Sequence, residues 1–239
     1  GVYVYGKKIR AFGGLPTGVT GRVLTLLSGG IDSPTAAFLM AKRGCTVDFI
    51  HFTAENIRPE NAHEYKVSKL AKTLSKFTME SRLYLVPYTH FEFELFGHKI
   101  FYELMIFRRF MTRTAEVLAE NISAQAIITG DNLAQVASQT LENLVANSRA
   151  TAMPILRPLI TYDKMEIVDL AKQIGTYTLS LKPYKDCCSI VAKNPKTSSE
   201  DSRLESLEED IFADYEDVIR QTLDEAVILE YSCGERVKK

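Results

Sequence analysis

Apolar residues along the chain occur either in short unbroken runs or at helical spacing. An unbroken run of apolar and β-branched residues is typical of a strand buried on both faces of a parallel sheet, and Val23–Leu27 is such a run. The same pattern predicts further strands at Val47–Phe52, Leu83–Val86, Ala124–Thr129 and Ile155–Leu159.

Segments with helical spacing separate these strands. The first, Pro34–Arg43, begins with a proline suited to a first helical turn and is followed by Gly44, which can end a helix. Helices are also predicted at Ala62–Phe77, Tyr102–Glu120, Gln135–Val145 and Lys164–Ile174. Alternation of strands and helices indicates βαβ units. The predicted fold class is therefore α/β, a doubly wound and mainly parallel sheet with helices on both faces.

The last part of the chain has a different composition. A polar stretch, Lys193–Ser199, is typical of a linker, and two acidic helical segments are predicted after it at Leu204–Ile219 and Gln221–Leu229. Residues 200–239 contain 13 of the 30 acidic residues but only 5 of the 29 Lys and Arg. The rest of the chain is thus moderately basic, which permits contact with nucleic-acid phosphates without establishing it.

Composition narrows the class of protein. The 239 residues are 46% hydrophobic, enough to bury a large core, yet no apolar run has the length of a membrane-spanning helix. The first ten residues lack the apolar region of a secretory signal. Four cysteines, two of them adjacent, do not form a disulfide framework. A cytoplasmic protein without a membrane partner is expected.

The densest chemical signal is the loop Ser28–Ser33, with the sequence Ser-Gly-Gly-Ile-Asp-Ser, between the first strand and the first helix. Free backbone N–H groups and the helix dipole favour an anion at this position. Gly29 and Gly30 allow close approach of a phosphate, and Ser28 and Ser33 can donate hydrogen bonds. Asp32 would repel phosphates unless it holds Mg²⁺ or acts in the reacting complex, so it indicates catalysis.

This loop lacks the Gly-Lys-Ser/Thr of a Walker A motif. It resembles the SGGxDS signature of the PP-loop ATP pyrophosphatases, whose fold is like that of the adenine nucleotide alpha hydrolases. These enzymes cleave ATP between the α- and β-phosphates and transfer AMP to an oxygen. The alternative is a glycine-rich turn that only precedes a helix.

Further blocks resemble the tRNA 4-thiouridine synthetase (ThiI) family, over about residues 13 to 196. They are Leu26–Pro34, Gly130 with Gln135–Asn143, Arg157–Ile160 with Asp163 and Lys164, and Ile174–Tyr177. The resemblance implies an ATP-dependent tRNA uracil 4-sulfurtransferase. ATP would adenylate the C4 oxygen of uridine-8, and persulfide sulfur would then displace AMP. A second role in supplying sulfur for the thiamine thiazole stays open.

The resemblance also implies site residues. Nucleotide contacts fall on Leu26, Leu27, His51, Phe52, Arg108, Gly130 and Gln139. Residues His51 and Phe52 end a strand at the carboxyl edge of the sheet, where doubly wound folds bind ligands, although His51 alone could be an ordinary strand-end histidine. Gln139 could bind a base edge or only its own loop.

Two basic groups need separate interpretation. Arg108 belongs to a row with Arg109 and Arg113 on one predicted helix, and the latter two are expected to face solvent or RNA. Lys164 matches a family lysine needed for adenylation, where a cation can neutralise charge as pyrophosphate leaves. Asp163, beside it, is expected to cap the helix that starts at Lys164.

The cysteines have different expected roles. Cys188 aligns with the family's catalytic cysteine, with a buried inert thiol as the alternative. Cys187 stays unassigned, Cys45 is expected in the core and Cys233 is incidental. Adjacent thiols are a poor tetrahedral clamp, so no metal site of zinc type is predicted.

The family comparison also suggests a domain division and partners. Residues 1–22 would be the remnant of an upstream THUMP domain and linker, residues 23–192 the catalytic domain, and residues 193–239 a linker and acidic helical tail. The expected cofactors are ATP and Mg²⁺, and the expected partners are tRNA, bound mainly by domains absent here, and a cysteine desulfurase. A homodimer is one state left open. The rival interpretations are another PP-loop thiolase or synthetase, and a non-catalytic nucleotide-binding module.

Overall fold

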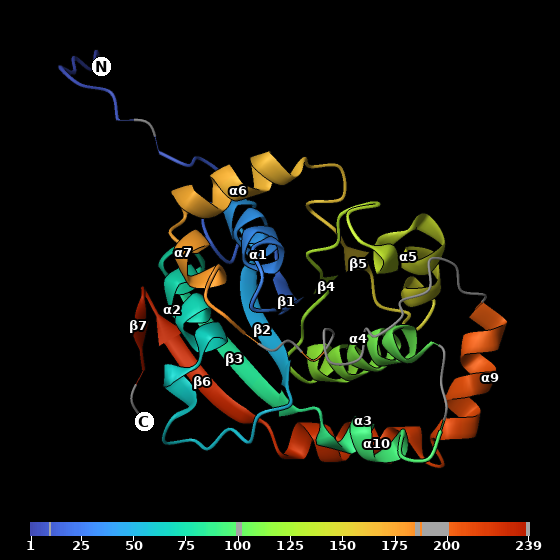
Figure 1. Ribbon diagram of the computed structural model, residues 1–239. Coiled ribbons are helices and arrows are strands. Elements are labelled where there is room, and N and C mark those ends of the chain that lie inside the picture. Colours follow the sequence, from blue (N-terminus) through green and yellow to red (C-terminus); the bar gives the residue numbers. More distant parts are fainter. Residues whose placement is uncertain (10, 99–101, 185–186, 188–200, 238–239) are drawn as a thin grey trace.

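A twisted sheet forms the centre of the molecule in the computed structural model, which describes residues 1–9, 11–98, 102–184, 187 and 201–237 (Figure 1). In this part of the chain the sheet has seven strands in the order β5-β4-β1-β2-β3-β6-β7. Strands β5 to β3 in this order run parallel, whereas β6 and β7 are antiparallel. The strands are β1 (Arg22–Leu26), β2 (Thr46–Thr53), β3 (Glu80–Pro87), β4 (Ile127–Ile128), β5 (Ile155–Leu156), β6 (Val227–Ser232) and β7 (Glu235–Arg236).

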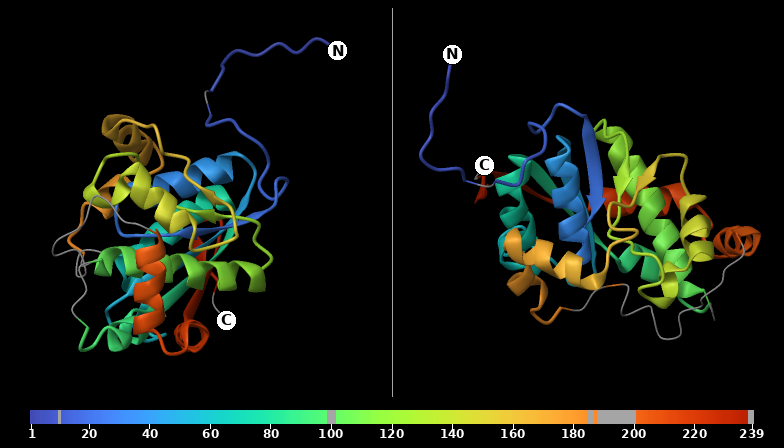
Figure 2. Two further views of the ribbon diagram at one scale, coloured as in Figure 1. Left: turned by 90° about the vertical axis from the view of Figure 1, so that its right-hand side faces the viewer. Right: turned by 90° about the horizontal axis from the view of Figure 1, so that it is seen from above.

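Helices cover both faces of this sheet (Figures 1 and 2). One face carries α1 (Asp32–Lys42), α2 (Lys66–Thr78), α6 (Lys164–Gln173) and α7 (Tyr177–Ser180), with the short η1 (Ala62–Glu64) before α2. The other carries α3 (Thr89–Glu94), α4 (Glu103–Asn121), α5 (Leu141–Ser148), α9 (Asp201–Ile211) and α10 (Tyr215–Asp224), with η2 (Ala137–Gln139) before α5. The predicted doubly wound α/β class is confirmed.

Side chains of the central strands divide between two hydrophobic cores because successive residues of a strand point to opposite faces. Val23 and Val47 pack with the residues of α1 and α2. Leu24, Ile50 and Phe52 pack with the aromatic residues of α4 on the opposite side. Because β1 and β2 have apolar side chains packed on both faces, these strands appear as apolar runs in the sequence.

The predicted elements differ from the observed ones mainly at their ends. The fourth strand is limited to Ile127–Ile128, and the helix expected from Gln135 starts only at Leu141, after η2. Thr140 caps this helix, since its side chain accepts a hydrogen bond from the Asn143 backbone N–H. The short helices α3 and α7 were not predicted, because neither is long enough to show a helical period.

The prediction of a helix over Gln221–Leu229 is wrong. Helix α10 ends at Asp224, and Val227–Ser232 forms β6, which pairs antiparallel with β3. Leu229 and Tyr231 are buried, whereas Ile228 is half-exposed, as the two-residue period of a strand requires. The end of the acidic segment therefore extends the same sheet that contains β1, while the division at residues 22/23 and 192/193 stays a prediction.

The predicted solvent- or RNA-facing position of Arg109 is also wrong. Arg109 is fully buried, and its guanidinium donates to Glu208 Oε2 at 3.0 Å, Asp201 Oδ1 at 2.7 Å and the carbonyl of Ala146 at 2.7 Å. Arg113, one turn further along, is partly exposed and contacts Glu208 Oε2 at 3.3 Å. Helix α9 lies against α4 and supplies the acidic residues that neutralise Arg109 and Arg113.

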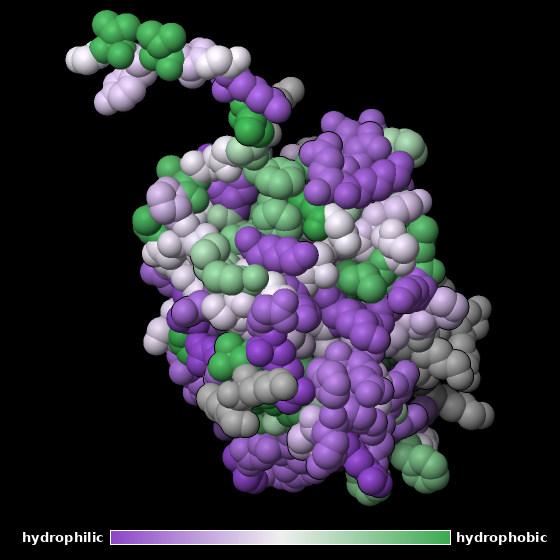
Figure 3. Space-filling view, turned by 90° about the vertical axis from the view of Figure 1, so that its left-hand side faces the viewer, coloured by the Kyte–Doolittle hydropathy of each residue, from purple (hydrophilic) through white to green (hydrophobic). Residues whose placement is uncertain are grey.

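The first residues form an extended arm that projects from the body (Figures 1 and 3). Hydrophobic side chains on this arm, such as Val2 and Val4, are almost completely exposed. Elsewhere the face shown in Figure 3 is mostly hydrophilic. None of the helices in the described part of the chain combines the length and the apolar character needed to cross a bilayer.

Candidate nucleotide site

A cavity of about 200 Å³ lies at the carboxyl ends of β1, β2 and β4. Strand β1 is the point where the strand order reverses, since the chain builds β2 and β3 on one side of it and β4 and β5 on the other. Ligands of doubly wound folds bind at such a switch point. Most of the predicted site residues line this cavity: Leu26, Leu27, Ser28, Asp32, Ser33, His51, Phe52, Arg108, Gly130 and Gln139.

The loop after β1 is held by its own serines. The Ser28 backbone N–H donates to Ser33 Oγ at 2.7 Å, the two hydroxyls are 3.0 Å apart, and Gly30 N–H donates to Ser28 Oγ at 3.2 Å. Ile31, the N-cap of α1, provides no side-chain cap. The first amides of α1 therefore lack the usual side-chain acceptor and can receive an anion.

Two glycines of the site have no room for a side chain. A Cβ on Gly29 would lie 2.6 Å from the ring of Tyr184, and one on Gly130 would lie 2.6 Å from the Ser33 backbone nitrogen. Gly130 thus lets the end of β4 approach the start of α1 closely. Gly130 and Ser33 both line the cavity.

Asp32 and Lys164, the two predicted catalytic residues in the described part of the chain, form an ion pair. Lys164 Nζ lies 2.7 Å from Asp32 Oδ1 and 3.1 Å from Oδ2, and Gln135 Nε2 donates to Oδ2 at 2.9 Å. The predicted cap at Asp163 is confirmed, since it forms a capping box with Glu166 that fixes the start of α6. The first residue of α6, Lys164, is thereby directed at the loop.

His51 lies near the carboxyl end of β2 and has both ring nitrogens engaged. Nδ1 donates to the carbonyl of Leu27 at 2.7 Å, because a carbonyl oxygen can only accept. In the neutral ring this leaves Nε2 to accept from the hydroxyl of Tyr184. The ring is buried, so a nucleotide would meet His51 through its ring face or the backbone of β2 rather than through a ring nitrogen.

A buried carboxylate organises the opposite wall of the cavity. Asp131 accepts hydrogen bonds from Arg108 Nη2 at 2.7 Å and Thr129 Oγ1 at 2.8 Å, and more distantly from Arg157 and Gln139, both at 3.4 Å. Burial alone would raise the pKa of Asp131, but the charge and hydrogen bond of Arg108 outweigh it and hold the pKa below its usual value. Asp131 is therefore an anion under ordinary conditions.

No role was predicted from the sequence for Asp131, and Arg157 was named only as part of a block that resembles the family. The one local signal was an acid placed directly after Gly130 at a strand end, where ligand-binding side chains gather. Gln139 uses its amide N–H₂ on Asp131, while its carbonyl Oε1 is buried and has no partner among the described residues. An unpaired buried acceptor on a cavity wall fits a ligand that donates, such as a purine amino group.

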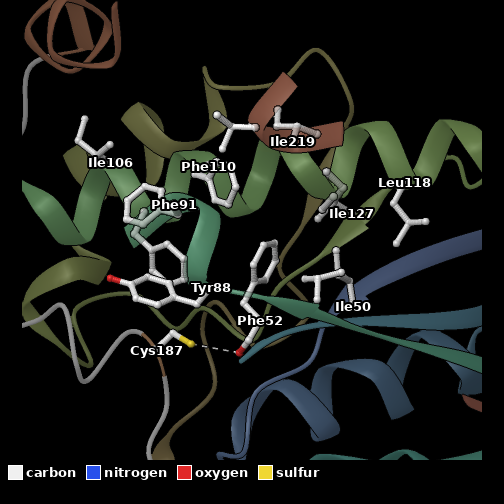
Figure 4. Packing of buried hydrophobic residues seen from close by; sticks show 14 of the residues in the cluster. Ile50, Phe52, Tyr88, Phe91, Ile106, Phe110, Leu118, Ile127, Cys187 and Ile219 are labelled. Atoms are coloured by element: carbon white, nitrogen blue, oxygen red, sulfur yellow. Dashed lines mark hydrogen bonds between the residues drawn. The ribbon is translucent and has the colours of Figure 1, made fainter. Parts of the chain in front are cut away.

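The cysteines fall into distinct environments. Cys45 is buried, which confirms its predicted place in the core, and Cys233 is exposed. Cys187 is 1% exposed, and its thiol donates to the carbonyl of Phe52 at 3.3 Å (Figure 4). Cys188, the predicted catalytic cysteine, lies outside the described residues.

Comparisons with known proteins show the family of the chain. The family described as Thiamine biosynthesis protein (ThiI) matches residues 18–212. The chain is 44% identical over 227 residues to a protein named probable tRNA sulfurtransferase from Brevibacillus brevis, covering 93% of this chain and 56% of that protein. It is 39% identical over 229 residues to the protein of the same name from Acetivibrio thermocellus, covering 95% and 58%.

A solved structure is also similar. The crystal structure of a 4-thiouridine synthetase–RNA complex with bound ATP superposes with a TM-score of 0.84 and 38% identity, over 96% of this chain and 58% of that one. The chain thus spans little more than half the length of the curated relatives and of the solved structure that it matches.

Proposed function

Because the chain belongs to the ThiI family, we propose that it carries the ATP-dependent chemistry of tRNA 4-thiouridine formation. The C4 oxygen of uridine-8 attacks the α-phosphorus of ATP, the α–β phosphoanhydride bond breaks and pyrophosphate leaves. A persulfide sulfur then bonds to C4, the carbon–oxygen bond breaks and AMP departs with the former carbonyl oxygen. A further thiol then attacks the protein sulfur of the C4–S–S link, so that a disulfide forms between these two thiols and the outer sulfur stays on the base.

The observation that carries this proposal is the pairing of Asp32 with Lys164 beside the unfilled amides at the start of α1. The loop amides and the dipole of α1 attract the phosphates. Lys164, held within 2.7 Å of Asp32, is near enough to neutralise negative charge that grows on departing pyrophosphate. Electrostatic groups fixed in advance in this way are a main source of catalysis in phosphate chemistry.

Mg²⁺ belongs to the same proposal. Magnesium in nucleotide enzymes is held by phosphates and one or two carboxylates rather than by a full protein cage. Asp32 supplies one such carboxylate, and the described residues contain no cluster of three or more His, Cys, Asp or Glu that could hold an ion alone. The side chains thus suit a metal that arrives with ATP.

The nucleoside end of ATP would occupy the cavity between β1, β2 and β4. Leu26, Leu27 and Phe52 supply apolar contacts, and the unpaired Oε1 of Gln139 can accept from the exocyclic amine. Arg108, fixed by Asp131, adds a positive charge on the wall. This arrangement supports ATP as the nucleotide.

Transfer RNA, a cysteine desulfurase and a homodimer remain proposed partners. The relative of known structure is described as a complex with RNA. The sulfur-handling role is proposed for Cys188, on its alignment with the family cysteine. Changing Cys188 to Ser is expected to leave adenylation intact and to block sulfur incorporation. Sulfur incorporation at the normal rate would contradict that assignment.

The experiment measures AMP and pyrophosphate formation with tRNA, ATP and Mg²⁺, using the protein in a form that matches the full length of its curated relatives. Asp32→Asn keeps the shape of the side chain but removes its charge, and Lys164→Ala removes the cation. Each is expected to lower the adenylation rate by about 10²- to 10³-fold. Lys172→Ala, on the same helix but paired with Asp169, is the matched control.

The outcomes separate the rival interpretations. AMP formation that depends on an acceptor other than tRNA would indicate a different PP-loop enzyme. ATP binding without any pyrophosphate release would indicate a non-catalytic nucleotide-binding module. Normal turnover in both Asp32→Asn and Lys164→Ala would contradict the proposed chemistry.

A further inference from the structure

A segment that follows α6 crosses the nucleotide loop. Helix α7 ends at Ser180, whose hydroxyl donates to the Gly30 carbonyl at 2.9 Å. Lys66, the first residue of α2, also holds this segment. Its ammonium group donates to the carbonyls of Ser180 at 2.8 Å and Lys182 at 2.7 Å. The chain between Ser180 and Tyr184 is therefore attached both to the loop and to the helix layer.

Tyr184 is the first contact of this segment with the end of β2. Its hydroxyl is hydrogen-bonded to His51 Nε2, and its ring lies so close to Gly29 that no side chain would fit there. Lys66 Nζ lies 5.6 Å from the centre of the same ring. Tyr184 thus contacts both the phosphate-binding loop and the strand end where the nucleoside is proposed to bind.

Cys187 is the second contact, three residues later. Its thiol donates to the Phe52 carbonyl at 3.3 Å, and the side chain is enclosed in the aromatic core near Tyr88 (Figure 4). With 1% of its surface exposed, this thiol cannot be reached by a persulfide donor or by a tRNA base without local opening.

We propose that Tyr184 and Cys187 are positioning residues that dock the segment ahead of Cys188 on His51 and Phe52 at the end of β2. Cys187 is then an anchor and does not carry sulfur. The inference rests on the proposed function. It assigns distinct roles to two adjacent cysteines that their sequence alone leaves equivalent.

The docking has a kinetic consequence. Both anchors bind residues of β2 that line the nucleotide cavity, so Tyr184 and Cys187 are held beside the proposed adenylate site. Loss of an anchor is expected to slow the attack on C4, because sulfur transfer depends on placing two reacting atoms together. Adenylation depends on Asp32 and Lys164 and is expected to change less.

The test uses the same full-length form and measures the two half-reactions separately: pyrophosphate release, and 4-thiouridine from its near-ultraviolet absorbance. Cys187→Ser retains a donor for the Phe52 carbonyl and is expected to thiolate within about twofold of the wild type. Cys187→Ala and Tyr184→Phe lose their anchors and are expected to thiolate about tenfold more slowly. Tyr177→Phe on α7 is the matched control.

Alkylation with iodoacetamide gives a readout that does not need activity. In a Cys188→Ser background, Cys187 is expected to react more than about tenfold more slowly than the exposed Cys233, and Tyr184→Phe to accelerate labelling of Cys187. Mass spectrometry of the labelled peptides and thermal melting of each variant complete the measurement. Melting separates loss of an anchor from loss of the fold.

Two results would overturn the inference. Loss of thiolation in Cys187→Ser, with adenylation intact, would make Cys187 the sulfur carrier. Wild-type thiolation in both Cys187→Ala and Tyr184→Phe would remove the positioning role. A wild-type chain that forms no 4-thiouridine would instead contradict the proposed function, and the labelling rates would still decide whether Cys187 is anchored.

Discussion

Arg108 and Arg109 are neighbours on α4, yet they serve two different regions of the molecule. Arg108 faces the nucleotide cavity and contacts Asp131 on its wall. Arg109 faces away from it and is enclosed by α9, where Glu208 and Asp201 accept its hydrogen bonds. Because consecutive residues of a helix point in different directions, Arg108 is a candidate binding residue whereas Arg109 belongs to the core.

The two guanidinium groups differ in whether they can contact a bound ligand. Arg109 is fully buried and its partners are all internal to the protein, so its charge is neutralised inside the fold. Arg108 shares one carboxylate, Asp131, with Arg157 and keeps its place on a cavity wall. Of the two arginines, only Arg108 lines the nucleotide cavity, so only Arg108 is placed to contact a ligand bound there.

The largest expected effect comes from Arg109→Met, because it leaves the buried carboxylate of Glu208 with less compensation. The free energy of unfolding is expected to fall by about 3–5 kcal/mol, measured by urea denaturation. Adding Glu208→Leu should recover much of this loss, since an apolar pair can replace a buried ion pair. A loss below about 1 kcal/mol for Arg109→Met would contradict its role in the core.

Arg108→Met makes the same chemical change one residue earlier and is expected to act on binding. Affinity for ATP, measured by titration calorimetry, should fall about tenfold, because a charged hydrogen-bonding group of the cavity is lost. The loss of stability should be smaller than for Arg109→Met, since Asp131 keeps Arg157 and Thr129. Arg149→Met, on an exposed side chain, is the control. An unchanged ATP affinity in Arg108→Met would contradict the assignment of Arg108 to the binding site.

These two arginines also show what the sequence could and could not predict. Strand β1, its loop and α1 were predicted because their signals are local: an apolar run, a glycine-rich turn and a helical period. The buried environment of Arg109 was not predicted, because the acids that neutralise it follow more than ninety residues later. Helical spacing alone cannot reveal a partner that distant in the sequence.

Strand β6 was missed for the same reason. Its partner, β3, precedes it by more than a hundred residues, and a short apolar run after an acidic helix fits either a strand or a helix end. In the candidate site, the loop residues could be found from their pattern, and His51 and Gln139 from the family resemblance. Asp131 and Tyr184 act through contacts between distant segments, which only the fold brings together.

The smallest expected effect is a pH dependence that distinguishes the cavity wall from the acidic helices. The pKa of Asp131 is held below its usual value of 3.8 in the fold, so its ionised form stabilises the native state above that pH. This stabilisation is lost as the pH falls through the lower pKa of the folded state. Urea denaturation of wild type and Asp131→Asn between pH 7 and 3 measures it.

The stability difference between these two proteins should stay constant near neutral pH and shrink below about pH 3.8. The variant Asp217→Asn, on the exposed side of α10, should follow the wild-type curve more closely. A difference that grows as the pH falls would contradict the assigned direction of the pKa.

A crystal structure of the chain with a non-hydrolysable ATP analogue and Mg²⁺ tests the central claim most directly. The account predicts phosphates at the first amides of α1, the metal and Lys164 beside them at Asp32, and the purine in the cavity near Phe52 and Gln139. An analogue bound elsewhere, with the loop of Ser28–Ser33 empty, would contradict the proposed adenylation.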